Sequence, residues 1–289
     1  MNVAPLQLPL ALVEPGCQRW AHGRASYRPP AEVIDTRCFE VDELDEHTAK
    51  AYVIANHYSG SYPAARLRVG LYRRRRGHQR WLCGVAVFSV PLSAHAVRRY
   101  ASRPATEGVE LGRFVLDDAV EANAETWFLA RAFRVLRERL PQVRIVLSYS
   151  DPLPRRSISG DTVLAGHVGT IYQAFNGRYV GRAKRRTLVL DRSGRIVSER
   201  TLSKLRQDDR GAAYAYRQLR ERGAPPRQPL ESGRAYVSRV LGSDAFRRLR
   251  HSGNHVYVWP VGSRRLQGRL RAGLALAERY PKRIDARVN

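Results

Sequence analysis

The stretch from residue 109 to residue 179 carries the clearest hydrophobic pattern in the chain. Residues 109–116 and 143–151 are apolar runs of strand length, and a helical pattern over 124–140 lies between them. A second helix is expected over 164–176. The apolar stripe of the first helix recurs at helical spacing and consists of Leu129, Phe133, Leu136 and Leu140. A helix between two strands predicts a parallel strand pair, with a ligand crevice at the carboxyl ends of the strands.

The pattern before residue 109 predicts a sheet that begins with antiparallel strands. We expect an irregular lead-in over residues 1–35, a short strand over 37–41 and a helix that ends near Asn56. Residues 66–72 alternate between apolar and polar, which is typical of a half-buried strand, and residues 81–90 are apolar on both faces. With the strand that follows, they would form an antiparallel meander before the sheet turns parallel.

These elements predict an α/β fold with a mixed central sheet flanked by helices over residues 36–191, with Arg186–Leu190 as its last strand. The composition changes after this strand. Residues 192–289 contain 23 Lys+Arg against 8 Asp+Glu. We therefore expect a basic C-terminal extension over residues 192–289 that binds DNA.

The formal net charge of +25 makes a polyanion the expected partner. A GC-rich genome that inflates the arginine content, or binding to a membrane surface, would give the same sign of charge. No apolar run reaches the length of about 20 residues that a membrane span needs. The charge therefore favours nucleic acid as partner. The shortness of the apolar runs argues against insertion into a membrane.

The three cysteines are Cys17, Cys38 and Cys83. Their number is odd and their spacing is not that of a metal site, so the sequence favours a reducing, cytoplasmic environment. Cys83 lies in an apolar run and is expected to be buried in a strand.

Several polar residues stand where the predicted fold would bring chemistry to the crevice. Asp151 ends the second parallel strand, where a carboxylate could accept a proton from an amine or help to hold a metal; an Asp-Pro turn is the alternative. His57 and Tyr58 follow the first helix, and His57 could be a base, a metal ligand or only a helix end. Arg113 lies inside a strand, where it could bind a substrate anion or pair with Glu110 or Asp151. Ser148, Tyr149 and Ser150 alternate between the two faces of the second strand.

Two basic clusters are candidates for contact with the phosphates of double-stranded DNA. Each of these residues could equally be a solvated surface charge. They are Arg73, Arg74, Arg75 and Arg76 at a predicted hairpin, and Arg182, Lys184, Arg185 and Arg186 before the last strand.

The order of elements resembles the GNAT (acetyltransferase-like) fold, and within it four segments resemble the Mom family of phage-type DNA modification proteins. These segments are Asn56-His-Tyr-Ser-Gly60, Glu110-Leu-Gly-Arg-Phe114, Ser148-Tyr-Ser-Asp151 and Gly169-Thr-Ile-Tyr-Gln-Ala174. The resemblance implies conversion of adenine N6 in double-stranded DNA to a carbamoylmethyl form, which protects the DNA from restriction, in the host cytoplasm. It implies Tyr172 as general acid and iron held by His57, Tyr58 and Asp151. An adenine inside a duplex is out of reach, so base flipping is expected, with Tyr58 or Tyr149 available to stack on the base.

One departure from this resemblance concerns the donor of the transferred group. Acetyltransferases of this fold carry a glycine-rich loop before the long helix, which binds the pyrophosphate of coenzyme A. Residues 117–125 have no glycine and contain four carboxylates, so ordinary acetyl-CoA binding is not expected and the donor is left open. Two alternatives remain: an N-acetyltransferase acting on a small amine or protein, and a non-catalytic DNA-binding protein on the same scaffold.

Overall fold

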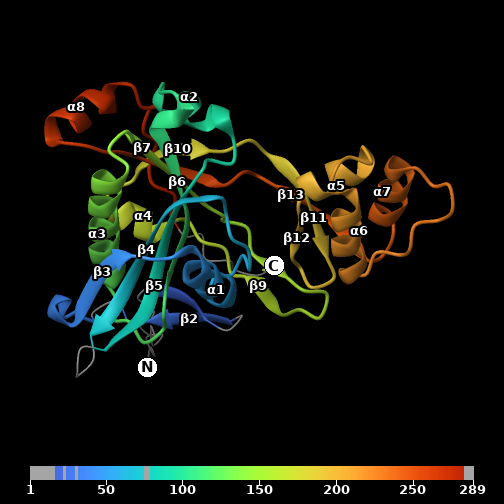
Figure 1. The fold of residues 1–289 in the computed structure, drawn as a ribbon, viewed down its shortest axis with the longest axis horizontal. Coiled ribbons are helices and arrows are strands. Elements are labelled where there is room, and N and C mark those ends of the chain that lie inside the picture. The colour runs from blue at the N-terminus through green and yellow to red at the C-terminus, as the bar shows by residue number, and fades with distance from the viewer. Residues whose placement is uncertain (1–16, 22–23, 30–31, 75–78, 283–289) are drawn as a thin grey trace, which may run out of the picture.

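A computed structural model describes residues 17–21, 24–29, 32–74 and 79–282 of the chain. A seven-stranded mixed sheet forms its centre (Figure 1). Its strands, in spatial order, are β10 (Arg178–Arg182), β14 (His255–Pro260), β7 (Ile145–Ser150), β6 (Gly108–Leu116), β5 (Arg80–Ser89), β4 (Ala65–Arg74) and β3 (Phe39–Glu43). β6 and β7 are parallel, and the other neighbours in this sheet are antiparallel. The predicted mixed sheet, with a meander before a parallel pair, is confirmed.

Helices cover both faces of this sheet. α3 (Ala124–Arg139) connects the parallel strands, as predicted, and its buried Leu129 and Leu136 pack in the main core. α4 (Thr170–Ala174) contributes Tyr172 to the same core. The opposite face is covered by α1 (Glu46–Asn56) and α2 (Ala94–Ala101).

Two sequence predictions about local structure are wrong. The helix expected over 164–176 is reduced to α4, because Gly166 and Gly169 have φ angles of 75° and 81° that no continuous helix tolerates. The residues before it, β8 (Arg155–Arg156) and β9 (Thr162–Leu164), form a small hairpin instead. The irregular lead-in also contains a paired hairpin, made of β1 (Cys17–Ala21) and β2 (Arg24–Arg28). The rest of the lead-in, residues 1–16, lies outside the described residues.

Residues 186–251 form a separate lobe beside the central sheet (Figure 1). Its three-stranded sheet and three helices enclose their own core, which includes Leu202, Leu219 and Tyr236. The elements are β11 (Arg186–Asp191), β12 (Ile196–Val197), α5 (Glu199–Arg206), α6 (Ala212–Glu221), α7 (Gly233–Leu241) and β13 (Phe246–His251). The predicted last strand is thus β11 and lies in the lobe.

The chain returns from the lobe to the central sheet. β14 inserts between β7 and β10, and α8 (Arg264–Ala272) follows it. Part of the stretch expected as a C-terminal extension therefore belongs to the central sheet, and the lobe is an insertion between two of its strands. None of the helices in the described part of the chain is long and apolar enough to span a membrane.

Candidate functional site

The parallel strands β6 and β7 separate part of the way along their length. They pair at three positions, the last of which joins Glu110 to Leu147. Beyond it, β6 continues beside β5 through a register shift, and β7 continues beside β14. The Ser148 hydroxyl donates to the Leu111 carbonyl across the separation at 3.0 Å. This strand split, at the carboxyl ends of the two strands, lies where the sequence predicted the crevice.

Three aromatic side chains from distant segments meet near the split, and we call them the split cluster: Tyr58, His167 and Tyr172. The Tyr58 hydroxyl lies 3.4 Å from His167 Nε2. The His167 ring is 5.9 Å from the Tyr58 ring and 6.5 Å from the Tyr172 ring, between centroids. The loop after α1 and the segment before α4 thus contribute to a single cluster. The sequence predicts both tyrosines as site residues but not His167, because a single His between glycines carries no spacing signal.

Burial sets the protonation of this cluster. It raises the pKa of Tyr58, and it raises that of Tyr172 despite the opposing effect of the nearby Ser148 hydroxyl. It lowers the pKa of His167 to about 4. At neutral pH the two phenols therefore keep their protons and can donate hydrogen bonds, while the imidazole is neutral and can accept one.

The loop after α1 holds His57 and Tyr58 in place. The His57 ring lies 4.2 Å from the Tyr58 ring, and its Nδ1 accepts a hydrogen bond from the Ser59 amide at 3.1 Å. Burial and the nearby Arg113 keep the pKa of His57 well below its ordinary value. Arg113 donates to the carbonyl and the hydroxyl of Ser61, each at 2.8 Å, so its observed role is to fix this loop. Ion pairing of Arg113 with Glu110 or Asp151 is not among the contacts of the described residues.

Asp151 lies at the junction between the central sheet and the lobe. Its carboxylate accepts hydrogen bonds from Arg155 at 2.6 Å, from His251 Nε2 at 2.9 Å and from the Leu153 amide at 3.0 Å. His251 Nδ1 accepts from the Gly253 amide at 2.9 Å, so Nε2 carries the hydrogen that is donated to Asp151. We call Asp151, Arg155 and His251 the junction triad; its latter two members were not found from the sequence.

This environment makes Asp151 a weak base. Burial raises its pKa, but Arg155 and the hydrogen bonds from His251 and Leu153 outweigh that effect and lower the pKa below its ordinary value. The contacts therefore favour a structural role for Asp151 over proton abstraction. Its predicted part in catalysis stays a prediction.

The serines of β7 face the split cluster, and Tyr149 faces the other side of the sheet. Ser148 and Ser150 are completely buried, and among the described residues no hydrogen-bond partner is found for the Ser150 hydroxyl. A Cβ atom at Gly169 would lie 3.0 Å from this hydroxyl and 2.9 Å from the Tyr172 ring, so the glycine permits close packing there. Tyr149 packs in the cluster below α2 instead. Alternation along β7 thus agrees with the prediction for these three residues.

Glu110 is a second carboxylate near the split that the sequence analysis did not select. Its side chain is buried, and its Oε2 accepts a hydrogen bond from the Leu92 amide at 3.2 Å. Burial raises its pKa, opposed by that hydrogen bond and by Arg113. A buried carboxylate held by one amide is costly to ionise, which makes Glu110 the stronger base of the two carboxylates.

The predicted iron site finds little support in the side chains. The described residues contain no group of three His, Cys, Asp or Glu side chains that could hold a metal ion. Both carboxylate oxygens of Asp151, one of the three proposed ligands, are already bonded within the junction triad. Binding of iron by His57, Tyr58 and Asp151 stays a prediction, and no step of the proposed chemistry depends on a metal.

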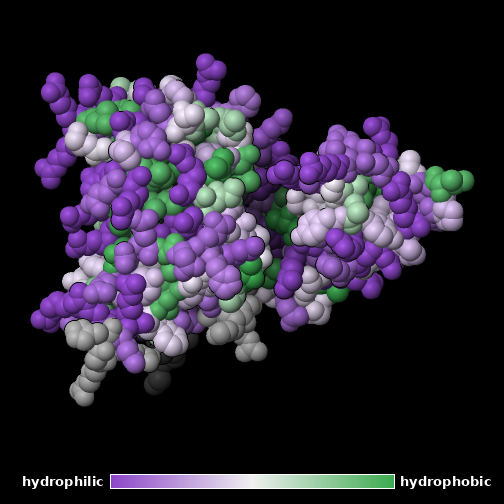
Figure 2. All heavy atoms as spheres, viewed as in Figure 1, coloured by the Kyte–Doolittle hydropathy of each residue, from purple (hydrophilic) through white to green (hydrophobic). Residues whose placement is uncertain are grey.

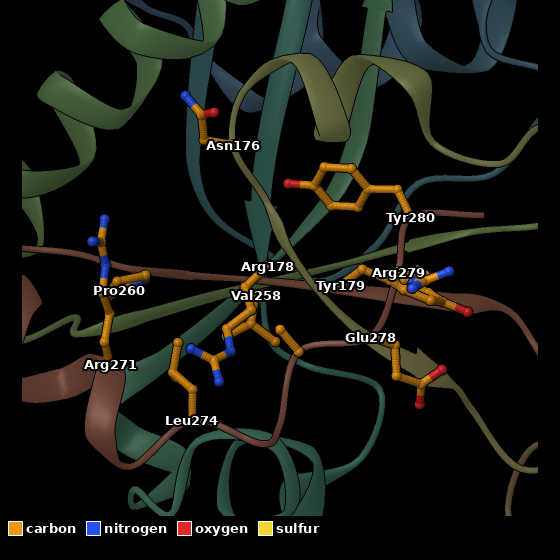
Figure 3. A pocket seen from close by; sticks show the side chains of 11 residues that line it. Asn176, Arg178, Tyr179, Val258, Pro260, Arg271, Leu274, Glu278, Arg279 and Tyr280 are labelled. Atoms are coloured by element: carbon orange, nitrogen blue, oxygen red, sulfur yellow. The ribbon is translucent and has the colours of Figure 1, made fainter. Parts of the chain in front are cut away.

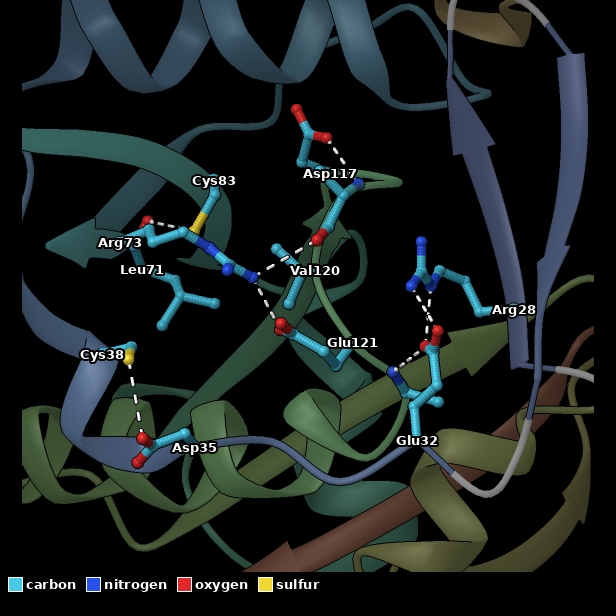
Figure 4. Close-up of polar contacts among 12 residues, drawn as sticks. Arg28, Glu32, Asp35, Cys38, Leu71, Arg73, Cys83, Asp117, Val120 and Glu121 are labelled. Atoms are coloured by element: carbon cyan, nitrogen blue, oxygen red, sulfur yellow. Dashed lines mark hydrogen bonds and ion pairs between the residues drawn. The ribbon is translucent and has the colours of Figure 1, made fainter. Parts of the chain in front are cut away.

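The loop before α3 does not fit acetyl-CoA either. The backbone amide of Ala122, in the loop two residues before the helix begins, donates to the Glu32 carboxylate at 2.9 Å (Figure 4). A carboxylate of the chain itself thus occupies the loop in which a pyrophosphate would have to bind.

The predicted DNA-contact residues divide into two groups. Arg73 and Arg74 are engaged within the protein, with Glu121 at 2.6 Å and Glu40 at 2.8 Å, while Arg75 and Arg76 lie outside the described residues. The second group lies on the neck, which we define as residues 182–186 and 252–254 between the central sheet and the lobe. Arg182 donates to Ser252 and Arg186 to Asn254, whereas Lys184 and Arg185 are exposed.

Hydrophilic side chains cover most of the visible face of the central sheet and of the lobe, and the molecule narrows between them (Figure 2). Two surface pockets lie apart from the split cluster. One, of about 490 Å³, lies at the β10 edge and is lined by Arg178, Arg271 and Arg279 among others (Figure 3). The other, of about 580 Å³, lies between β3 and α3 beside Trp127.

Comparison with known proteins finds a family match and several similar solved structures. The model of the Mom protein family matches residues 38–228. A comparison with curated proteins finds no match. Among solved structures, a tandem GNAT protein from the clavulanic acid biosynthesis pathway, determined without AcCoA, is similar at 11% identity with a TM-score of 0.32. That alignment covers 67% of this chain and 53% of the other, so the chain spans about half the length of that protein.

Proposed function

Because this chain belongs to the Mom protein family, we propose that it is a DNA modification enzyme that converts adenine N6 in double-stranded DNA to a carbamoylmethyl form. Modified adenines would protect the DNA from restriction enzymes. The observation that carries the proposal is the split cluster, which joins three side chains at the carboxyl ends of the parallel strands within the matched residues. The enzyme would act as a transferase, with a donor that remains to be identified.

The reaction forms a bond between adenine N6 and the carbon of the transferred group. It breaks one N6–H bond and the bond between that carbon and the rest of the donor, which departs as the leaving group. Tyr58 and Tyr172, which keep their protons at neutral pH, would donate hydrogen bonds to the base or to the leaving group. The neutral ring of His167 would accept the proton that N6 loses, since N6 becomes acidic as the new bond forms. Arg113 would keep the Tyr58 loop in position through Ser61.

Reaching N6 requires the adenine to leave the duplex, because the base is stacked and paired there. The half-buried His57 and Tyr58 would stack against the flipped base. The neck and the lobe would hold the flanking phosphates, with the exposed Lys184 and Arg185 among the cations that contact them. The duplex would then span the neck between the central sheet and the lobe.

The proposal is tested by mass spectrometry of nucleosides from plasmid DNA of cells that express this chain, with cells carrying an empty vector as control. We expect deoxyadenosine heavier by a carbamoylmethyl group only in the expressing cells, and resistance of that DNA to restriction enzymes. Unmodified adenine in cells that contain the folded protein would contradict the proposal. Retained DNA binding in that case would indicate a non-catalytic DNA-binding protein.

A further inference from the structure

The amino end of α3 is occupied by side chains from the beginning of the chain. We call these residues the strap: Cys17–Ala21, Arg24–Arg28 and Glu32. Glu32 Oε2 accepts from the Ala122 amide at 2.9 Å and from Arg28 Nε at 2.8 Å (Figure 4). The Glu32 carbonyl accepts from the Asn123 side chain at 3.1 Å. A carboxylate at this position is favourable, because the unpaired amides at a helix start carry a partial positive charge.

Two arginines of the strap fix the same loop. Arg28 donates to the Asp118 carbonyl at 2.7 Å. Arg19, only 4% exposed, donates to the Val120 and Glu121 carbonyls and forms an ion pair with Glu125, which is 3% exposed. The strap is therefore anchored by a buried ion pair and not by surface contacts alone.

Two further amides of this loop form hydrogen bonds within the loop. The Ala119 amide bonds to Asp117 Oδ1 at 2.8 Å and the Val120 amide to the Asp117 carbonyl at 3.1 Å. Arg73 reaches in from β4 to Glu121 at 2.6 Å (Figure 4). The carboxylates that were expected to repel a pyrophosphate are thus partly neutralised by arginines of the chain. Because these arginines are already bonded to the loop, they are not available to bind a phosphate.

From these contacts we infer that Glu32 is a built-in anion at the amino end of α3 and that the strap closes this end of the helix to any diphosphate. Two consequences follow. Coenzyme A and nucleotide diphosphates do not bind at the α3 amino end, and the donor of the transferred group is not held there through a diphosphate. The second consequence rests on the proposed transferase function, whereas the first does not.

The strength of the closure follows from charge. A diphosphate entering this position would have to displace Glu32 from both the Ala122 amide and Arg28, and it would then face Asp117, Asp118 and Glu121. The arginine contacts and the amide hold the pKa of Glu32 below its ordinary value, so the carboxylate is charged at neutral pH. Removing Glu32 alone would leave the loop carboxylates in place and would not create a diphosphate site.

Hydrogen exchange of the full chain, followed by mass spectrometry of peptides over residues 117–126, tests this inference. Glu32→Ala should speed exchange of the Ala122 amide about fivefold, the effect of losing one hydrogen bond. Glu32→Gln keeps an oxygen acceptor and should retain most of the protection. Arg37→Ala, which removes a surface ion pair with Asp35, is the matched control and should leave these peptides unchanged.

The same peptides are then measured with millimolar coenzyme A and, separately, with inorganic pyrophosphate. We expect no added protection in the wild type and none in Glu32→Ala. Protection of residues 117–126 by either compound in the wild type would overturn the inference, as would unchanged exchange in Glu32→Ala. These outcomes do not depend on DNA modification, so failure of the proposed function and failure of this inference are distinguishable.

Discussion

Replacing Asp151 by Asn should separate a structural role at the lobe junction from a role in catalysis. The change removes the negative charge that faces Arg155 and His251. All three residues are buried: Asp151 and Arg155 are each 7% exposed and His251 is 2% exposed. Arg155 would be left buried without its carboxylate, and its Nε already lacks a hydrogen-bond partner among the described residues. Breaking a buried ion pair by removing one partner costs about 3–5 kcal/mol, so we expect a loss of that size in the free energy of unfolding.

Urea unfolding measures this loss, with two signals that report different parts of the molecule. Trp127 and Trp259 pack in the main core and the lobe contains no tryptophan, so fluorescence follows the central sheet and circular dichroism follows both parts. Removing the charges together in Asp151→Asn/Arg155→Met should recover much of the lost stability. Asp42→Asn, which breaks an exposed ion pair with Arg80, is the control and should cost less than about 1 kcal/mol.

The pH dependence gives an independent check on the same residue. The pKa of Asp151 is lowered in the folded protein, so its contribution to stability is present above its ordinary pKa of 3.8 and is lost as the pH falls through the lowered value. The difference between wild type and Asp151→Asn should therefore shrink in acid. A variant that loses less than about 1 kcal/mol of stability yet abolishes adenine modification would refute this reasoning and assign Asp151 to the chemistry.

Three further predictions concern other parts of the molecule. Arg19→Ala removes the buried ion pair with Glu125 and should cost about 3–5 kcal/mol in urea unfolding; a loss below about 1 kcal/mol would mean that the strap is not anchored there. Glu110→Gln removes a buried carboxylate with a raised pKa but keeps an acceptor for the Leu92 amide, so it should raise the stability by about 1–2 kcal/mol once Glu110 is ionised. Because the wild type loses stability as the pH rises through the raised pKa, this gain should grow with pH in thermal unfolding; a gain that is the same at all pH values would contradict it. Removing Lys184 and Arg185 together should reduce the slope of log K for duplex binding against log salt by about 2, whereas an unchanged slope would show that the neck does not contact phosphates.

The centre of the fold was predictable because its signals are local. The stripe of α3 and the apolar strands on either side of it depend on periodicity within a few turns, and the parallel pair follows from the crossover. β14 was missed because its place in the sheet depends on pairing with β7 more than 100 residues earlier, and the lobe between β10 and β14 hides that relation. The helix expected over 164–176 is interrupted because Gly166 and Gly169 adopt positive φ angles, which the apolar pattern alone does not predict.

The candidate site was predictable only in part, for the same reason. Tyr58 and Tyr172 stood out because they follow recognisable elements, but His167 joins them through a contact over 109 positions in sequence. The sequence predicts Asp151 as a base or metal ligand because it ends a strand. Its partner His251 lies 100 positions away on the lobe. Lone histidines and arginines carry no spacing that would reveal such partners.

The most direct test of the split cluster as the reaction site is the adenine modification produced by Tyr172→Phe, compared with Tyr62→Phe. Each variant removes one phenolic oxygen, but no hydrogen-bond partner of the Tyr62 hydroxyl is found among the described residues. The amount of carbamoylmethyl-adenine in plasmid DNA is measured by mass spectrometry of its nucleosides, for both variants and for the wild type at matched levels of folded protein. We predict that Tyr172→Phe loses most of the carbamoylmethyl-adenine while Tyr62→Phe retains the wild-type amount. Equal modification in both variants would contradict the assignment of the reaction to the strand split.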